Sequence, residues 1–312
     1  MTHVAMIVLS FYPADPRVRR EAETLERQGI SVDVICMRGP DEKKVEEIGR
    51  IKVYRVIKGS NKENMVKYLL LSTKFMIISF AVLCYLSFKK RYKLIQAHNM
   101  PDYLIFTGII HKIIGVPLIL DLHDLTVELF ETKWGRHKRI LNSLVKFAEK
   151  ISCGFANEII TTSTGFKERL IERGITANKI TLVLNSADHY IFKFNPQREF
   201  HKIQKDLRLL YHGTVTKRFG LTTVIEAVAQ LQDTIPETTL EIYGKYDDSY
   251  REELYEKINS LGINDHIILG GYLSLEEISL KIEHSHIGIV PYLSDPFMNL
   301  ALSTKTFEYV AM

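Results

Sequence analysis

Cysteine is scarce in this sequence, and its three copies, Cys36, Cys84 and Cys153, are widely spaced and form no CxxC pair. This pattern is typical of reduced, buried thiols in a cytoplasmic protein. The first residues, "MTHVAMIVLSFYP", lack the basic region and the cleavage site of a signal peptide, so we interpret their apolar run as a first strand. The formal net charge is only +4, and we therefore expect no nucleic-acid partner.

Several catalytic signatures are also missing. No GxGxxG follows the first strand, where "SFYPADPRV" (10–18) stands instead, and the sequence contains neither GxSxG nor a cysteine–histidine signature. A hydride-transfer dehydrogenase and a hydrolase are therefore disfavoured. The segment "DLHD" (121–124) places Asp121 and His123 on one side of a strand, but no HxxxH or second acidic cluster accompanies it. We expect no metal here, and we expect His123 to form hydrogen bonds or to stabilise charge near a substrate.

The chain of 312 residues is long enough for two domains. Short β-branched runs alternate with helical segments of ten or more residues, which indicates βαβ units and parallel sheets. The alternation breaks at 185–206 and then restarts. We therefore predict an α/β protein with two Rossmann-like, doubly wound domains, 1–195 and 196–312, that face a cleft. Because only four strands with their helices follow the break, and the last helix is unfinished, we expect the second domain to be incomplete.

The segment 65–93 is unusually apolar, with Lys67 and Lys74 as its only charges before a basic cluster at 89–93. Its uncharged stretch 75–88 is shorter than the roughly 20 residues that span a bilayer. One interpretation is a long helix that is buried on most faces. The other interpretation is a helix that lies in the membrane interface and is held there by the basic cluster. The second interpretation predicts a peripheral protein at the cytoplasmic face of the inner membrane.

The most informative loop is "YHGTVTKRFGL" (211–221), because a parallel sheet binds its ligand beyond the carboxyl ends of its strands. A strand ends at Gly213, and Gly220 opens an amphipathic helix, with Lys217 and Arg218 between them. Backbone N–H groups at a helix start and two cations can cradle a diphosphate. The alternative is a solvated loop with two surface cations.

The last residues, "STKTFEYVAM" (303–312), place Lys305 and Glu308 about one helical turn apart. A glutamate in the first turns of a helix is favoured by the helix dipole, by about 0.3–1 kcal/mol, and this is the plainer interpretation. A carboxylate at a strand-end rim can also accept hydrogen bonds from two vicinal hydroxyls of a ribose. Lys305 on the same face would then meet a phosphate.

Taken in order, these segments resemble the nucleotide-sugar-dependent glycosyltransferases of family 4, which have the two-Rossmann GT-B architecture. "DPRVRREAETLERQG" resembles the first loop and helix of that family, "DLHD" its strand-end histidine motif and "LVLNSAD…F" its interdomain stretch. "YHGTVTKRFGL" is similar to the phosphate-binding turn, and "STKTFEYVAM" to the helix with the Lys-x-x-Glu-Tyr pattern. The family continues beyond this helix, so the resemblance implies that the chain is truncated at its C-terminus.

The resemblance implies a retaining hexosyltransferase that moves a sugar from a nucleotide-diphosphate sugar to a glycan or lipid-linked acceptor in surface polysaccharide biosynthesis. It implies no metal and no cofactor other than the nucleotide sugar as co-substrate. The second half would bind the donor and the first half the acceptor. The expected catalytic residues are His123, Lys217 and Arg218. The expected donor-binding residues are Gly213, Thr214, Gly220, Gly244, Lys305 and Glu308. The expected acceptor-binding residues are Arg17, His98 and Asp124.

Two other hypotheses stay open. A nucleotide-sugar 2-epimerase has the same architecture but needs further carboxylates in the cleft. A non-catalytic homologue that binds a nucleotide or a membrane is favoured by Thr214, Phe219 and Leu300, which stand where many members of the family carry charged residues.

Overall fold

The computed structural model describes residues 2–59, 65–134, 139–196 and 206–312, and the chain forms two compact units. The first unit comprises Met1–Leu184 together with Asn299–Ala301. The second comprises Asn185–Met298 together with Leu302–Met312. The sequence placed the division between 195 and 196, within the stretch where the strand–helix alternation breaks.

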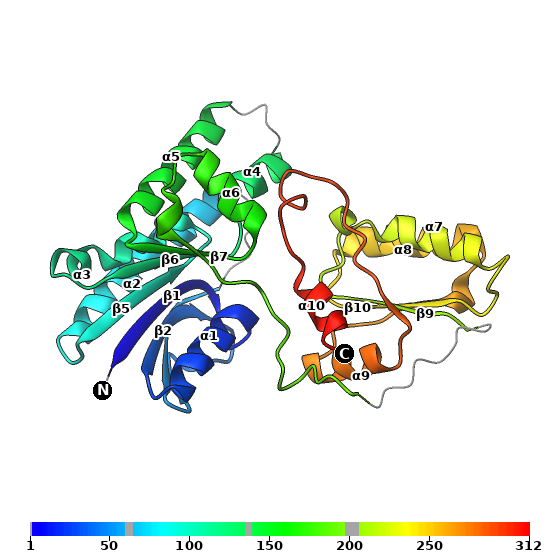
Figure 1. Ribbon diagram of the computed structural model, residues 1–312, viewed down its shortest axis with the longest axis horizontal. Coiled ribbons are helices and arrows are strands. Elements are labelled where there is room, and N and C mark those ends of the chain that lie inside the picture. The colour runs from blue at the N-terminus through cyan, green and yellow to red at the C-terminus, as the bar shows by residue number, and fades with distance from the viewer. Residues whose placement is uncertain (1, 60–64, 135–138, 197–205) are drawn as a thin grey trace. The chain divides into compact units, whose positions relative to one another are not determined.

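The first unit is built on a sheet whose described strands follow the order β3-β4-β2-β1-β5-β6-β7-β8 (Figure 1). All neighbouring pairs in this order are parallel except β3 with β4. The strands are β1 (His3–Phe11), β2 (Ser31–Arg38), β3 (Val45–Ile48), β4 (Ile51–Lys58), β5 (Tyr92–His98), β6 (Leu118–Leu122), β7 (Glu158–Thr161) and β8 (Ile180–Leu182). The strand-like runs of the sequence, 4–9, 31–36, 51–57, 94–99, 116–124, 157–163 and 180–185, predict seven of these strands, whereas the antiparallel edge strand β3 was not predicted.

Helices cover both faces of this sheet. They are α1 (Pro16–Arg27), α2 (Met65–Ser87), the 3-10 helix η1 (Asp102–Gly108), α3 (Ile109–Ile113), α4 (Thr126–Trp134), α5 (Arg139–Phe155), α6 (Thr164–Glu172) and η2 (Ala177–Lys179). The chain moves one way along the sheet from β1 to β2 and the other way from β4 to β8, so right-handed crossovers place α1 on one face and α2, α3, α5 and α6 on the other. Figure 1 shows α1 below the sheet and α5 and α6 above it.

Local sequence explains how α1 begins. Asp15 accepts a hydrogen bond from the backbone N–H of Val18 at 3.3 Å, and Pro16 occupies the first helical position. The helix then buries Val18 and Ala22 against β1, β2 and β4, in a core cluster that includes Met6, Val32 and other strand residues. This packing fixes the start of α1 beside the carboxyl end of β1.

The structure of the long helix α2 contradicts one of the two interpretations of segment 65–93. Only 28% of its most apolar stretch is buried, so the expectation of a helix buried on most faces is wrong. The helix has 23 residues and a mean hydropathy of 2.0 over that stretch, and by length and composition alone it could cross a membrane. It buries Phe75 and Leu83 within the first unit, while Leu70 and Ile77 remain 68% and 59% exposed.

The second unit is a smaller parallel sheet with the order β11-β10-β9-β12. Its strands are β9 (Arg208–His212), β10 (Thr239–Tyr243), β11 (Ile267–Leu269) and β12 (Ile287–Gly288). Its helices are η3 (Lys217–Phe219), α7 (Leu221–Leu231), α8 (Asp248–Leu261), η4 (Asn264–His266), α9 (Leu275–Glu283) and α10 (Thr304–Val310). Helices α7 and α8 cover one face and α9 the other, as the reversal of strand order after β11 requires (Figure 1).

The short helix α10 packs on the second sheet through Tyr309. The hydroxyl of Tyr309 donates to the backbone oxygen of Leu210 at 3.0 Å, and its ring lies against Gly288 of β12, where a side chain would collide with it. This packing holds the preceding residues of α10 beside the carboxyl end of β9. Both units are therefore Rossmann-like α/β structures, which confirms the predicted fold class.

Candidate active site

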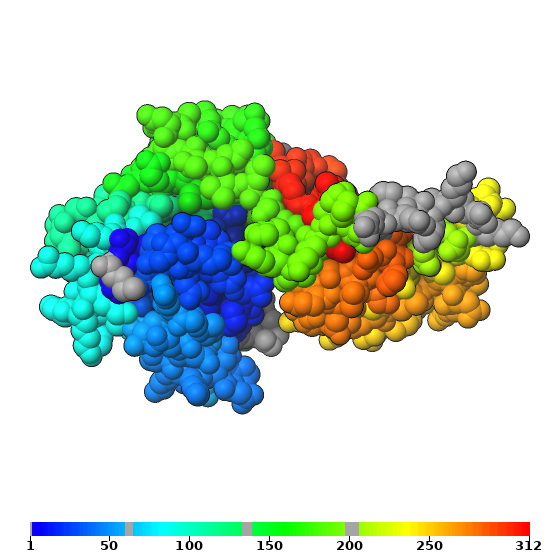
Figure 2. Space-filling model, turned by 60° about the horizontal axis from the view of Figure 1, so that its bottom comes forward, coloured from blue at the N-terminus to red at the C-terminus, as the bar shows by residue number. Residues whose placement is uncertain are grey.

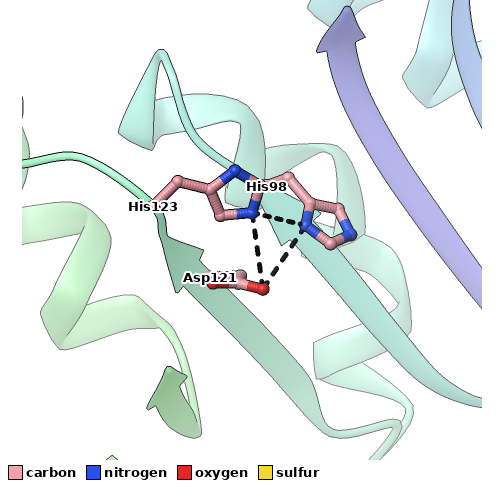
Figure 3. Close-up of side chains that lie close together, drawn as sticks. All are labelled: His98, Asp121 and His123. Atoms are coloured by element: carbon pink, nitrogen blue, oxygen red, sulfur yellow. Dashed lines mark hydrogen bonds and ion pairs between the residues drawn. The ribbon is translucent and has the colours of Figure 1, made fainter. Parts of the chain in front are cut away.

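Three polar side chains meet at the carboxyl ends of β5 and β6 in the first unit (Figure 3). His98 ends β5, Asp121 lies beside it in β6, and His123 follows β6 directly. The Nδ1 atom of His98 lies 3.1 Å from Nε2 of His123. The Oδ2 atom of Asp121 lies 3.4 Å from the first of these nitrogens and 3.5 Å from the second. The carboxylate therefore holds both imidazole rings in a fixed orientation.

Two side chains of α1 and one of β5 surround the carboxylate. Arg17 donates from Nη2 to Oδ1 of Asp121 at 2.9 Å, and its Nε lies 3.2 Å from Oε1 of Glu21, one turn later. Gln96 donates from Nε2 to Glu21 at 2.7 Å and to Oδ2 of Asp121 at 3.0 Å. Asp121 is thus a buried anion that accepts hydrogen bonds from several donors, which offsets the cost of burying its charge.

The electrostatics of the cluster make Asp121 an anion and favour a cationic His123. Burial alone would raise the pKa of Asp121, but the adjacent His123 and His98 outweigh burial and hold this pKa well below its ordinary value. Burial alone would lower the pKa of His123, but Asp121 outweighs it and raises this pKa. Burial, and after it the charge of Asp121, raises the pKa of Glu21. The side chain of His123 is 16% exposed and that of His98 is 0% exposed, so of the two histidines a ligand can reach only His123.

The three predicted acceptor-binding residues lie in or next to this cluster. Arg17 and His98 are buried and contact Asp121, so the structure places them to orient the cluster. Asp124 is half-buried, and its backbone oxygen accepts from Nδ2 of Asn99 at 2.6 Å. Contact of these residues with an acceptor stays a prediction.

The geometry of the same cluster would allow a metal ion to bind there. Among the described residues, His98, Asp121 and His123 form a group whose ligand atoms all lie within 4.8 Å of one another. Nitrogen and carboxylate ligands of this kind suit Zn²⁺. However, Gln96 already donates to the carboxylate oxygen that would ligate the ion, and the guanidinium of Arg17 adds positive charge at the other oxygen. We therefore keep the prediction that the site takes no metal.

In the second unit, a cation lies over the glycine that ends β9. A Cβ atom added to Gly213 would lie 2.6 Å from Cε and 3.0 Å from Nζ of Lys305, and Gly213 has a φ of +109°, so only glycine fits here. The ammonium of Lys305 lies 5.1–5.5 Å from the ring centroids of Tyr211, Phe219 and Tyr292 and donates to the Tyr292 hydroxyl at 3.3 Å. Within the described part of the chain, Lys305 pairs with no carboxylate. Its charge is therefore available to a ligand.

Glu308 lies one turn beyond Lys305 and contacts the end of β9. Its Oε2 lies 3.3 Å from Nε2 of His212, and both side chains are largely buried, at 8% and 7% exposed respectively. Burial, and after it the ammonium of Lys305, lowers the pKa of His212 to about 3, so the imidazole is neutral at pH 7. The ring of Tyr309 lies edge-on to His212, with centroids 5.2 Å apart. Lys305 and Glu308 are thus brought together at one strand end, as the sequence predicted.

The other three predicted donor-binding residues, Thr214, Gly220 and Gly244, lie in or beside the loop that follows β9. Gly220, with a φ of +67°, ends η3 and begins α7, and Gly244 follows β10 beside Gly213. Thr214 is exposed, and its backbone oxygen accepts from the Tyr211 hydroxyl at 2.6 Å. The three positions therefore surround the loop that follows β9.

The two cations predicted to be catalytic are paired with carboxylates. Lys217 has a side chain that is 75% exposed, and its Nζ lies 2.9 Å from Glu253 on α8. Nη2 of Arg218 lies 3.3 Å from Oδ2 of Asp295, and its guanidinium lies 5.7 Å from the Phe219 ring. Of the three cations Lys217, Arg218 and Lys305, the structure places Lys305 directly over Gly213.

The sequence interpretation missed Glu21 and Gln96, and it named His212 only as a strand-end candidate without a role. Glu21 follows Arg17 at the helical spacing of i, i+4, and Gln96 shares its side of β5 with His98, so both spacings were readable from the sequence. His212 directly precedes Gly213 at a strand end. Their partners, however, come from other elements and could not be read from spacing.

Two Rossmann-like sheets with polar residues gathered at their strand ends define a protein of the two-domain Rossmann-like α/β class. The sequence matches the model of Glycosyltransferase Family 4 over residues 16–189, and it matches Glycosyl transferases group 1 over residues 193–298. The chain belongs to Glycosyltransferase Family 4 and is a glycosyltransferase. This confirms the resemblance noted in the sequence.

Several solved structures have a similar fold. Sucrose-phosphate synthase from Thermosynechococcus elongatus is 18% identical, with a TM-score of 0.75 over 95% of this chain and 77% of that one. The catalytic domain of starch synthase IV from Arabidopsis thaliana, bound to ADP and acarbose, is 11% identical, with a TM-score of 0.69 over 98% and 80%. HepE from Anabaena in complex with UDP is 17% identical, with a TM-score of 0.61 over 94% and 75%. They support the predicted GT-B fold. A search of curated protein sequences found no match.

Proposed function

We propose that the protein transfers a hexosyl group from a nucleotide-diphosphate sugar to a glycan or lipid-linked acceptor, with retention at the anomeric carbon, in surface polysaccharide biosynthesis. One observation carries the donor half of this proposal. Lys305, a cation without a carboxylate partner among the described residues, lies over Gly213 at the end of β9, and the carboxylate of Glu308 lies one turn away. The similar Anabaena structure, which contains UDP, supports a nucleotide donor.

The two charges suit the two ends of a nucleoside diphosphate. The carboxylate of Glu308 accepts the hydroxyl hydrogen bonds of the ribose, because a carboxylate has acceptor capacity for both hydroxyls at once. The ammonium of Lys305 meets the diphosphate. Cleavage of the bond to the sugar leaves negative charge on that diphosphate, and a cation placed in advance stabilises it in the transition state.

The first unit supplies the acceptor side of the reaction. His123 is the partly exposed member of its cluster, and Asp121 holds its ring and raises its pKa. A cationic or hydrogen-bonding imidazole at this position stabilises charge near the transferred sugar. Arg17 and His98 keep this imidazole oriented. No metal and no further cofactor enters the proposed reaction.

We place the protein in the cytoplasm, at the face of the cell membrane, with residues 65–93 as its contact. The exposed apolar residues of α2 and the basic residues that follow it support this location. A lipid-linked acceptor would be presented at that surface.

The proposal is tested by calorimetric titration of the protein with UDP, GDP and ADP. We expect one of them to bind, and we expect Glu308→Ala to weaken that binding by about 1–3 kcal/mol, roughly 5- to 150-fold in the dissociation constant. The isosteric Glu308→Gln separates loss of charge from loss of shape. Glu276→Ala, at an exposed glutamate in the first turn of α9, is the matched control and should bind like the wild type.

The bound nucleotide then decides which sugar donors to supply with lipid-linked and glycan acceptors. A transferred sugar with retained configuration supports the proposal. A sugar released as its 2-epimer would make the protein an epimerase, and nucleotide binding without any product would make it a binding homologue. No affinity for any of the three nucleotides would reject the donor site.

A further inference from the structure

Helix α5 turns its apolar side away from the protein. Ile140, Leu144, Phe147 and Ile151 follow the spacing i, i+4, i+7 and i+11, which forms one stripe along a helix. These four side chains are 79%, 57%, 61% and 43% exposed. A surface helix of a soluble domain normally buries such a stripe, and this helix leaves it uncovered.

The side of α5 that faces the first unit is instead rich in polar groups. Its buried residues are Asn142, Glu149, Ser152 and Cys153. Glu149 pairs with Arg173, with 2.7 Å between its Oε1 and the Nε of the arginine. The orientation of α5 is therefore held by specific polar contacts, and the outward apolar stripe belongs to the folded structure.

Helices α2 and α3 extend the exposed apolar surface on the same side of the sheet. Phe88, directly after α2, is 91% exposed, and Ile113 and Ile114 at the end of α3 are 79% and 69% exposed. Figure 2 shows the molecule from the α1 side, with the cyan to turquoise residues of this part of the chain at its left edge. Large contiguous apolar surfaces of this kind mark interaction sites.

Direct contacts join the three helices. Oγ of Ser87, the last residue of α2, lies 2.6 Å from Nε2 of His111 on α3. Lys112 on α3 donates to the backbone oxygen of Phe155, the last residue of α5, and the rings of Phe106 and Phe155 lie 4.8 Å apart. The 3-10 helix η1 packs against both α2 and α5. We call the surface made by Ile77, Phe88, Ile113, Ile114, Phe147 and Ile151 the apolar face.

The exposed charges within the segments that form the apolar face are of one sign. Segments 65–93 and 109–117 contain no aspartate or glutamate, and the only acidic residue of α5 is the buried Glu149. The exposed charges of these segments include Lys67, Lys74, Lys89, Arg91, Lys93 and Lys150. A surface that combines exposed apolar side chains with cations fits the interface of an anionic membrane. A second copy of the chain fits it less well, because self-association through this face would bring like charges together.

We propose that the apolar face docks the first unit on a bilayer of anionic phospholipid, with α2, α3 and α5 lying along its surface. The apolar side chains enter the boundary between headgroups and acyl chains, and the cations meet the lipid phosphates. Helix α2 lies on the membrane and does not cross it, because Phe75 and Leu83 stay packed in the unit at 0% exposure. This inference extends the membrane contact proposed for 65–93 to α3 and α5 and names the lipid, and it is independent of nucleotide binding.

The test is flotation of the full chain with vesicles of phosphatidylcholine alone and with vesicles that contain roughly 30% phosphatidylglycerol. We expect binding to the anionic vesicles that is much stronger than binding to the neutral ones and that weakens as salt is added. The double variant Phe147→Ser, Ile151→Ser should lose about tenfold or more of this binding, since two apolar anchors leave the interface. Leu280→Ser, at a 57% exposed leucine of α9, is the matched control and should float like the wild type.

Both substituted side chains are exposed, so the double variant should fold like the wild type, and circular dichroism checks this. Lys89→Glu with Lys93→Glu provides a second variant that leaves every apolar residue in place and should also weaken binding to anionic vesicles. Failure of the wild type to float with either vesicle, or flotation of both variants at the wild-type level, would overturn the proposal. A concentration-dependent dimer that the double variant abolishes would assign the face to a second copy of the chain and overturn it as well.

Discussion

The placement of Lys305 gives a prediction that ranks the three cations named from the sequence. The sequence named Lys217 and Arg218 as catalytic and Lys305 as a donor-binding residue that meets a phosphate, and of the three the structure places Lys305 over Gly213. Lys305→Met removes the ammonium and keeps a long apolar side chain among the rings of Tyr211, Phe219 and Tyr292. A charge-assisted hydrogen bond contributes about 1.5–3 kcal/mol, so we expect the nucleoside diphosphate to bind roughly 10- to 150-fold more weakly.

Lys217→Met is the matched substitution at a paired, exposed lysine. The side chain of Lys217 is 75% exposed and its ammonium pairs with Glu253. Exposed ion pairs contribute about 0–1 kcal/mol, so the affinity for the nucleotide should change less than about fivefold. Both variants therefore lose one lysine charge, but the structure gives that charge different surroundings at the two positions.

Calorimetry with the nucleoside diphosphate and with its parent nucleoside completes the assay. The loss caused by Lys305→Met should appear with the diphosphate and vanish with the nucleoside, because only the diphosphate carries the charge that Lys305 meets. The loss caused by Glu308→Ala should persist with the nucleoside, whose ribose is intact. If Lys305→Met bound the diphosphate like the wild type while Lys217→Met did not, the reasoning from the position of Lys305 would be refuted.

Two further predictions follow from the glycine turn and from the histidine cluster. Gly213→Ala puts a methyl group 2.6 Å from Cε of Lys305 and should weaken diphosphate binding about as much as Lys305→Met. Gly262→Ala, where no such neighbouring atom lies within 4 Å, should not weaken this binding. Equal affinities of the two variants for the diphosphate in calorimetry would contradict this prediction. Asp121 raises the pKa of His123, so the stabilisation from this pair is complete below about pH 6.5 and is lost as the pH rises through the raised pKa. Urea denaturation should therefore show a difference in unfolding free energy between wild type and His123→Gln that shrinks as the pH is raised above about 6.5, and a constant difference would reject the pairing.

Much of the fold could be predicted because its signals are local. The alternation of strands and helices, the glycines at strand ends and the cap of α1 by Asp15 are all patterns within a few residues. The prediction missed β3, a four-residue edge strand that is held by antiparallel pairing with β4. It also missed α4, which begins three residues after His123. Short elements of this kind depend on their neighbours more than on their own periodicity.

The candidate site could be predicted only as far as local signals reach. Gly213, Lys305 and Glu308 could be assigned to strand-end turns, because Gly213 follows a predicted strand and the other two lie in the first turns of a predicted helix. The pairing of Lys217 with Glu253 could not be predicted, because it depends on where α8 lies. The binding of a donor by these residues stays a prediction.

By itself, the sequence determined the α/β class, the two parallel sheets and the strand ends where polar side chains gather, because periodicity and turn residues act over short stretches of chain. Only the tertiary structure decided which of those side chains meet: His98 reaches Asp121 because β5 and β6 pair in register, and Lys305 reaches Gly213 because Tyr309 packs α10 beside β9. It also decided that the apolar stripe of α5 faces outward, since a hydrophobic period shows that a helix has two sides but not which side is covered.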